Sequence, residues 1–205
     1  MFKLVIYFIC NTHYFFNVMS KTKKIRWENR LINDTGNDAL VTVDGTDFRI
    51  QEPIPFNRKW FSKKFNGPAL RYEVGISINT GYIVWFNGPF PAGMMPDIKI
   101  FESNLKWKMS SGERVVADKG YTGVPQVLCP RSAKNDKHRK EMSKARARHE
   151  TVNRRFKEWQ CLQQRWRHDR EKHHLVFSAV AGLTQIEILN GQPLYQIDYD
   201  SKIKF

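Results

Sequence analysis

Three acidic residues in this sequence stand where a carboxylate could take part in metal-assisted chemistry. Asp44 and Asp118 each end a short β-rich run, and a glycine follows each within two residues. Glu150 lies in residues 136–166, a segment without glycine or proline that predicts a long helix. A carboxylate at the end of a buried strand is unfavourable unless a cation or a donor meets it. An Asp-Gly hairpin turn would explain Asp44 equally well if it stood alone; the two further carboxylates favour a metal site.

The chemistry expected of such a trio is phosphodiester cleavage. Ligand sets made only of oxygen select Mg²⁺, or Mn²⁺, over zinc. Two such ions ~3.5–4 Å apart can hold a phosphodiester between them and activate a water. In this interpretation Asp44 bridges both ions, while Asp118 and Glu150 each hold one.

The helix expected over residues 136–166 would place Glu150 at the edge of the core. At about 100° per residue, one stripe of this helix forms the core face, and its members are Ala145, His149, Val152, Phe156 and Trp159. A second stripe, rotated by roughly 110°, holds Arg146, Glu150, Asn153 and Lys157. The alternative is a solvated face whose i,i+4 ion pair adds only ~0.3–0.5 kcal/mol. The two strand-end aspartates favour the site.

The charge of the chain indicates a polyanionic partner. Lys and Arg number 34 against 20 Asp and Glu, which gives a net charge of +14. Such an excess favours nucleic acid ahead of a membrane surface. The apolar run at residues 4–10 is shorter than the ~18 residues that span a bilayer. The 3 cysteines show no C-x-x-C spacing, which argues against a disulfide framework or a zinc knuckle.

Strands and helices alternate along the rest of the sequence, which predicts an α/β domain. The 205 residues suit one domain with tails. Strands are expected over residues 39–44, 46–51, 71–78, 82–87, 114–117 and 126–129, and helices over residues 97–105, 136–166 and 173–189. We divide the chain into a poorly defined N-terminal segment and linker, a catalytic domain and a C-terminal tail, at residues 1–38, 39–196 and 197–205.

Four motifs in this order resemble the DDE-superfamily transposases, in particular the Harbinger-like endonuclease group. They are Val43-Asp-Gly-Thr46, Gly93-x3-Asp97, Ala117-Asp-Lys-Gly-Tyr121 and Arg146-x3-Glu150-x6-Lys157. The run Asn190-Gly-x-Pro-Leu194 also resembles the family's tail.

The resemblance implies a ribonuclease-H-like fold, with a mixed five-stranded sheet flanked by helices. Its first and fourth strands would lie side by side, with a long glutamate-bearing helix packed on the sheet and a buried C-terminal helix. The implied catalytic and metal-binding residues are Asp44, Asp118 and Glu150, and the implied supporting residues are Gly45, Asp97, Gly120 and Tyr121. The expected DNA-binding residues are Lys119, Arg146, Arg154 and Lys157. For Asp97, helix capping is the alternative explanation.

The function that follows is a divalent-metal-dependent DNA endonuclease of transposase type, with Mg²⁺ or Mn²⁺ as cofactor and strand transfer to target DNA as a second step. The alternative is a catalytically inactive, transposase-derived DNA-binding or interaction protein. Expected partners are transposon ends or target DNA and a second copy in a homodimer, without a membrane. The residues before Asp44 match the family's helical DNA-recognition region poorly, which predicts a separate recognition protein or a missing N-terminal region. The expected location is the nucleus in a eukaryote and the cytoplasm otherwise.

Overall fold

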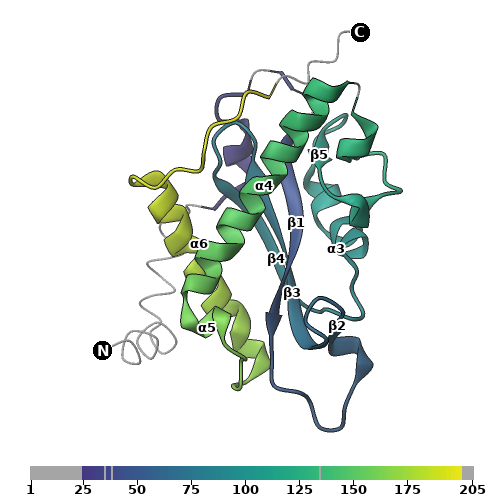
Figure 1. The fold of residues 1–205 in the computed structure, drawn as a ribbon, viewed down its shortest axis with the longest axis vertical. Helices are drawn as coiled ribbons and strands as arrows, with labels where there is room; N and C mark the ends of the chain where they lie inside the picture. Colours follow the sequence, from purple (N-terminus) through teal and green to yellow (C-terminus); the bar gives the residue numbers. More distant parts are fainter. Residues whose placement is uncertain (1–24, 35, 38, 134, 200–205) are drawn as a thin grey trace.

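A computed structural model describes residues 25–34, 36–37, 39–133 and 135–199 (Figure 1). The strands are β1 (Ala39–Arg49), β2 (Phe61–Ser62), β3 (Gly67–Ser77), β4 (Ile83–Pro91), β5 (Arg114–Val116) and β6 (Val127–Leu128). The α-helices are α3 (Asp97–Ser103), α4 (Asp136–Glu158), α5 (Gln160–Gln163) and α6 (His173–Leu189). The 3₁₀ turns are η1 (Trp27–Leu31), η2 (Arg58–Trp60), η3 (Leu105–Lys108), η4 (Lys119–Tyr121), η5 (Pro130–Ser132) and η6 (Arg170–Lys172). The apolar run at residues 4–10 lies outside the described residues.

The strands form one mixed sheet, as the family resemblance implied. Its order is β2-β3-β1-β5-β6, and β4 also pairs with β3. β1 is antiparallel to β3 and parallel to β5. If the two-residue β2 is set aside, β5 is the fourth strand, so the expected neighbourhood of the first and fourth strands is confirmed. The sheet has six strands rather than five because β2 adds a short edge.

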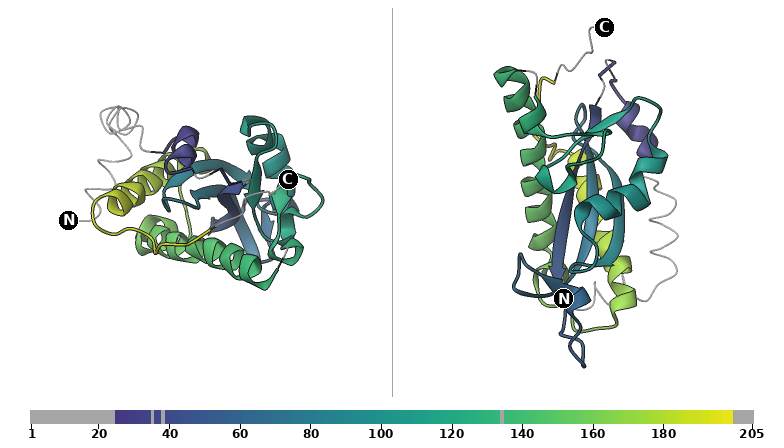
Figure 2. Two further views of the ribbon diagram at one scale, coloured as in Figure 1. Left: turned by 90° about the horizontal axis from the view of Figure 1, so that it is seen from above. Right: turned by 90° about the vertical axis from the view of Figure 1, so that its right-hand side faces the viewer.

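Helices cover both faces of the sheet (Figures 1 and 2). On one face α4 and α6 pack on a core that includes Phe48, Tyr72 and Phe177. The rings of Tyr72 and Phe177 stack with 3.9 Å between centroids. On the other face α3 and η4 pack on a second core that includes Val43. Because side chains alternate along a strand, β1 contributes to both cores.

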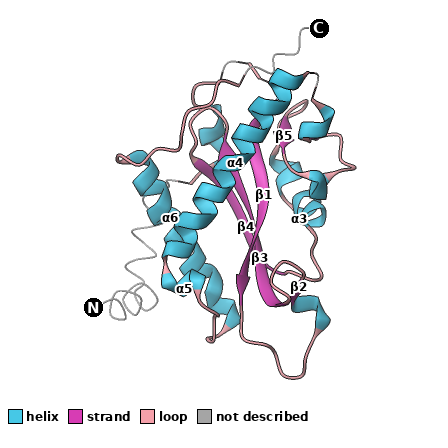
Figure 3. Ribbon diagram, viewed as in Figure 1, coloured by secondary structure: helices cyan, strands magenta, loops and turns pink. Residues whose placement is uncertain are grey.

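Several elements differ from the sequence-based expectations (Figure 3). β3 begins at Gly67 rather than at residue 71, and β4 continues to Pro91 rather than ending at residue 87. β1 continues through Gly45, whereas an interruption was predicted there. The long helix ends at Glu158 because Trp159 has extended backbone angles, φ −81° and ψ 112°. The buried C-terminal helix is confirmed as α6, many of whose residues lie in the core. Within the described ranges no helix is long and apolar enough to cross a membrane.

The region expected to be a linker is packed against the domain where the structure describes it. Arg30 in η1 is only 5% exposed, and its Nε and Nη2 donate to the two carboxylate oxygens of Glu113 at 2.7 and 3.0 Å. This two-point ion pair fastens η1 to the segment just before β5.

Candidate active site

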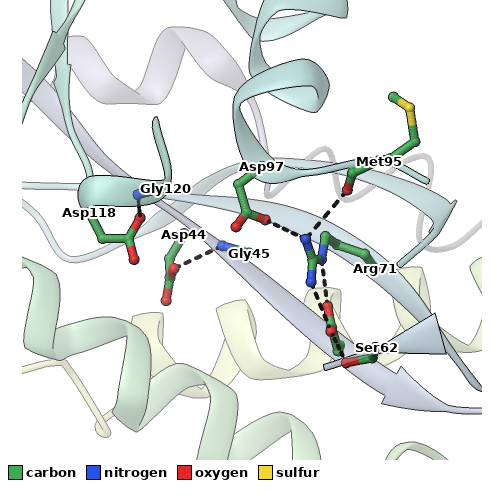
Figure 4. A network of polar contacts seen from close by, with 9 residues as sticks. Asp44, Gly45, Ser62, Arg71, Met95, Asp97, Asp118 and Gly120 are labelled. Carbon is green, nitrogen blue, oxygen red and sulfur yellow. Dashed lines mark hydrogen bonds and ion pairs between the residues drawn. The ribbon is translucent and has the colours of Figure 1, made fainter. Parts of the chain in front are cut away.

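Asp44 and Asp118 lie on neighbouring parallel strands. Thr42 of β1 is in register with Val116 of β5, so the aspartates two residues further on occupy adjacent positions (Figure 4). Oδ1 of Asp44 accepts a hydrogen bond of 2.9 Å from the backbone N–H of Gly45. Oδ1 of Asp118 accepts one of 2.7 Å from the backbone N–H of Gly120 and thereby caps η4. The two predicted aspartates therefore lie side by side, where β5 ends beside the middle of β1.

Asp97, at the start of α3, brings a third carboxylate to the same place (Figure 4). A Cβ at Gly45 would overlap Oδ1 of Asp97, and a Cβ at Gly120 would lie 3.4 Å from its Oδ2. The carboxylate thus fills the space above the glycine that follows Asp44 and borders the loop that follows Asp118. The helix-cap explanation of Asp97 is wrong: Pro96 holds the cap position, and no side chain caps α3.

An arginine network anchors Asp97. Nε and Nη2 of Arg71 donate to Oδ1 and Oδ2 of Asp47 at 2.7 and 3.0 Å. Nη1 of Arg71 lies 3.4 Å from Oδ1 of Asp97, an oxygen that is buried and accepts no hydrogen bond from the described residues. The hydroxyl of Ser62 donates to Asp47 at 2.6 Å. One guanidinium therefore joins β3 to β1 and to α3.

The electrostatics of the aspartates follow from their burial and crowding. The pKa of Asp44 is raised by burial and then by the charge of Asp118, and the Gly45 hydrogen bond and the charges of Arg146 and Lys64 oppose this. Burial raises the pKa of Asp97 to about 6; Arg71 lowers it, whereas the neighbouring aspartates raise it. Burial is thus the largest cause of both raised pKa values, and the crowding of the carboxylates adds to it.

Two further polar groups lie buried behind the aspartates. Glu73, opposite Gly45 on β3, is 0% exposed, and its Oε2 accepts a bond of 3.0 Å from Nε1 of Trp85. Burial raises the pKa of Glu73 to about 8, so this carboxyl is mostly protonated at neutral pH. The hydroxyl of Tyr121 is buried without a hydrogen-bond partner in the described residues. Burial, and then the charges of Glu73 and the three aspartates, raise the pKa of Tyr121, so this expected supporting residue lies close to the site.

Glu150 lies on α4, and its side chain is exposed. No described contact joins it to Asp44 or Asp118, and among the residues that the structure describes no three His, Cys, Asp or Glu side chains are placed to hold a metal ion. The preceding residue, His149, packs on β1, with its Nε2 2.9 Å from Oγ1 of Thr42, so α4 passes beside the strand that carries Asp44. The predicted trio is therefore not assembled in this structure, and the role of Glu150 stays a prediction.

The cations predicted to bind DNA are distributed unevenly around the site. The positive charge of Arg146 lowers the pKa of Asp44. Lys157 is close enough for Asp47 to act on its pKa, which is lowered by burial and by Lys64. Lys119 is exposed and lines a cavity together with Asp118. Arg154 is exposed on α4, and no described contact links it to the aspartates.

The family described as DDE superfamily endonuclease matches residues 43–185, a span that runs from the residue before Asp44 into α6. This chain belongs to the DDE superfamily endonucleases. It is 26% identical over 195 residues to the probable transposase for insertion sequence element IS702 of Microchaete diplosiphon, with 88% of this chain and 70% of that protein covered. No solved structure matches the chain.

In this DDE endonuclease the close contact between Gly45 and Asp97 can be tested by substitution. Gly45→Ala should destabilise the protein by ~1–3 kcal/mol, because the new methyl group overlaps the carboxylate of Asp97. In the double variant, Asp97→Ala should make room for the methyl group, so Gly45→Ala should destabilise it less. A double-mutant cycle should then give a coupling free energy of ~0.5–3 kcal/mol. Urea unfolding of the wild type, both single variants and the double variant measures it. Strictly additive effects would show that the two residues do not share this space.

A second expectation concerns the pH dependence of stability. The folded pKa values of Glu73 and Asp97, about 8 and about 6, lie above the ordinary values of 4.5 and 3.8. Their contribution is therefore fully present below the ordinary values and is lost as pH rises through the folded values. Without divalent cations, the part of the unfolding free energy due to these groups should grow as pH falls from about 8 towards about 5.

Glu73→Gln tests this dependence, because glutamine keeps the size of the side chain and cannot titrate. Urea unfolding in EDTA at several pH values should give a stability gain on acidification that is smaller in Glu73→Gln than in the wild type. Glu52→Gln, at an exposed position, is the matched control and should leave the gain unchanged. An identical pH profile for wild type and Glu73→Gln would exclude Glu73 as the titrating group.

Proposed function

We propose that this chain is the endonuclease of a transposase and that it hydrolyses phosphodiester bonds in DNA with a divalent cation. The observation that carries the proposal is the proximity of Asp44, Asp118 and Asp97 where β5 ends beside the middle of β1, and burial and mutual repulsion raise the pKa values of Asp44 and Asp97 there. A bound cation would relieve this repulsion, and carboxylate oxygens are the donors that Mg²⁺ and Mn²⁺ prefer. Asp44 and Asp118 supply oxygen donors of this kind, and the chemistry of these donors, rather than an assembled set of three ligands among the described residues, supports the cofactor.

Each residue has a distinct part in this proposal. Asp44 and Asp118 would hold the cation, with Glu150 as the ligand that α4 supplies. When bound, the cation would lower the pKa of a water and stabilise the leaving oxygen. Arg146 and Lys119 would bind the phosphates on either side of the cut, and Arg71 would keep Asp97 in position. The resulting 3′-hydroxyl group would then attack target DNA in a strand-transfer step.

The experiment is a nicking assay on supercoiled plasmid with the purified chain. Cutting should occur with Mg²⁺ or Mn²⁺ and should be absent with Ca²⁺ or EDTA. In parallel, affinity for duplex DNA should fall steeply as salt rises, because the basic surface releases counterions from the DNA. Protein that binds DNA in this way and never cuts it would decide for the inactive, transposase-derived alternative.

A further inference from the structure

A cavity of about 610 Å³ opens beside Asp118, between η4, β6, η5 and α4. Its volume falls in the range of ~300–1,000 Å³ that is usual for small-molecule sites. Because Asp118 lines both this cavity and the aspartate cluster, an occupant of the cavity would lie next to the bond that is cut. We call it the Asp118 cavity.

One side of the Asp118 cavity is cationic. Lys119, Arg131 and Arg146 line it, against the single acidic residue Asp118. Nε of Arg146 is buried and has no hydrogen-bond partner among the described residues. A buried guanidinium N–H without an acceptor is unfavourable, and phosphate oxygens are acceptors that arginine binds strongly. This side of the cavity is therefore prepared for a phosphate group.

The rest of the lining combines apolar and hydroxyl side chains. Val127 and Pro130 give it apolar surface, with both side chains only partly buried, and Thr122 and Ser132 add hydroxyl groups. A phosphate ion alone would leave this apolar surface facing water, whereas a nucleotide carries both an anionic group and a flat, largely apolar base. Apolar and aromatic surfaces next to a cationic groove are the usual setting for an unpaired base.

We propose that the Asp118 cavity binds one unpaired nucleotide of the DNA strand beside the phosphate that is cut. Its phosphate lies on Arg131 and Arg146, and its base lies against Val127 and Pro130. This inference rests on the proposed nuclease function, since DNA is the ligand in both. A base stacked in a duplex cannot enter a cavity, so the nucleotide must be unpaired first, at a cost of about a few kcal/mol. DNA with unpaired bases should therefore bind more tightly at this position than an intact duplex.

The test uses a cysteine that lines the cavity. Cys129 is a free thiol that is partly buried, and its Sγ donates to the backbone carbonyl of Asp118 at 3.2 Å. Its alkylation rate, followed by peptide mass spectrometry on the full chain in EDTA, reports occupancy without any cutting. Cys161, the other cysteine in the described part of the chain, does not line the cavity and is the internal control.

A single-stranded oligonucleotide at ten times its dissociation constant should slow alkylation of Cys129 about tenfold and leave Cys161 unchanged. An abasic oligonucleotide of the same length should protect much less, and inorganic phosphate should not protect. Arg131→Gln should remove most of the protection. Arg139→Gln changes the charge equally at an exposed position outside the cavity and should retain it.

Equal protection by the abasic oligonucleotide or by phosphate would overturn the assignment of a nucleotide, and full protection in Arg131→Gln would overturn the site. These results are separable from those of the nicking assay. A chain that cuts DNA while Cys129 stays unprotected would refute the cavity alone. A chain that protects Cys129 and never cuts would refute the nuclease function and leave the cavity standing.

Discussion

Asp44→Asn should reduce DNA cutting by at least ~10²-fold, the scale seen when one preorganised charge is removed from a water-excluded site. Asparagine keeps the shape of the side chain, and its oxygen can still accept the Gly45 N–H bond. It lacks the charge that a divalent cation requires. Single-turnover cleavage with Mg²⁺ or Mn²⁺ measures the loss. Asp136→Asn, at an exposed position on α4, is the matched control and should cut normally.

Binding separates this effect from damage to the fold. The DNA affinity of Asp44→Asn should stay the same or rise, because a negative charge that faces the phosphates has been removed. Cutting that persists at the wild-type rate would point to a contaminating nuclease rather than to this chain.

Glu150→Gln is expected to lose cutting on a similar scale of ~10²-fold, with little change in stability. Its side chain is exposed and makes no described contact with the other carboxylates, so the fold does not depend on it. If α4 supplies the third ligand, the substitution should also raise the Mn²⁺ concentration needed for half-maximal cutting. Measuring rate against Mn²⁺ concentration gives both quantities.

Asp97→Asn is the comparison that makes this result decisive. Removing its charge relieves repulsion on Asp44 and Asp118, so this variant should unfold at higher urea concentration than the wild type in EDTA and should lose less activity than Glu150→Gln. The reverse order, with an inactive Asp97→Asn and an active Glu150→Gln, would make Asp97 the third ligand and remove Glu150 from the site.

The parts of this molecule that could be predicted from the sequence are those with a local pattern. Asp44 and Asp118 end β-rich runs, and the parallel pairing of those runs follows from the family's topology, so their meeting could be foreseen. The long helix could also be foreseen, because its segment has no glycine or proline. Its end at Trp159 could not be, since a change in backbone angles there leaves no compositional signal.

The missed residues depend on contacts between distant segments. Glu73 lies in a strand pattern, where a polar residue ordinarily predicts a solvent-facing side. Here it lies opposite Gly45, which has no side chain, and the charge of Asp97 from α3 helps to raise its pKa, although burial is the larger cause. No sequence pattern indicated the ion pair of Arg71, because its partner Asp47 lies 24 residues away in the sequence. Arg131 and Cys129 meet Arg146 only where η5 and α4 enclose the Asp118 cavity.

The space shared by Gly45 and Asp97 also restricts how this protein can change over time. Position 45 tolerates a side chain only if a smaller residue replaces Asp97 or if α3 moves away. Substitutions at the two positions are therefore not independent. Among related sequences, those with alanine or serine at position 45 should carry a shortened residue at position 97. Covariation between these positions, 52 apart in the chain (97 − 45), would record the packing of α3 on β1 without any further structure.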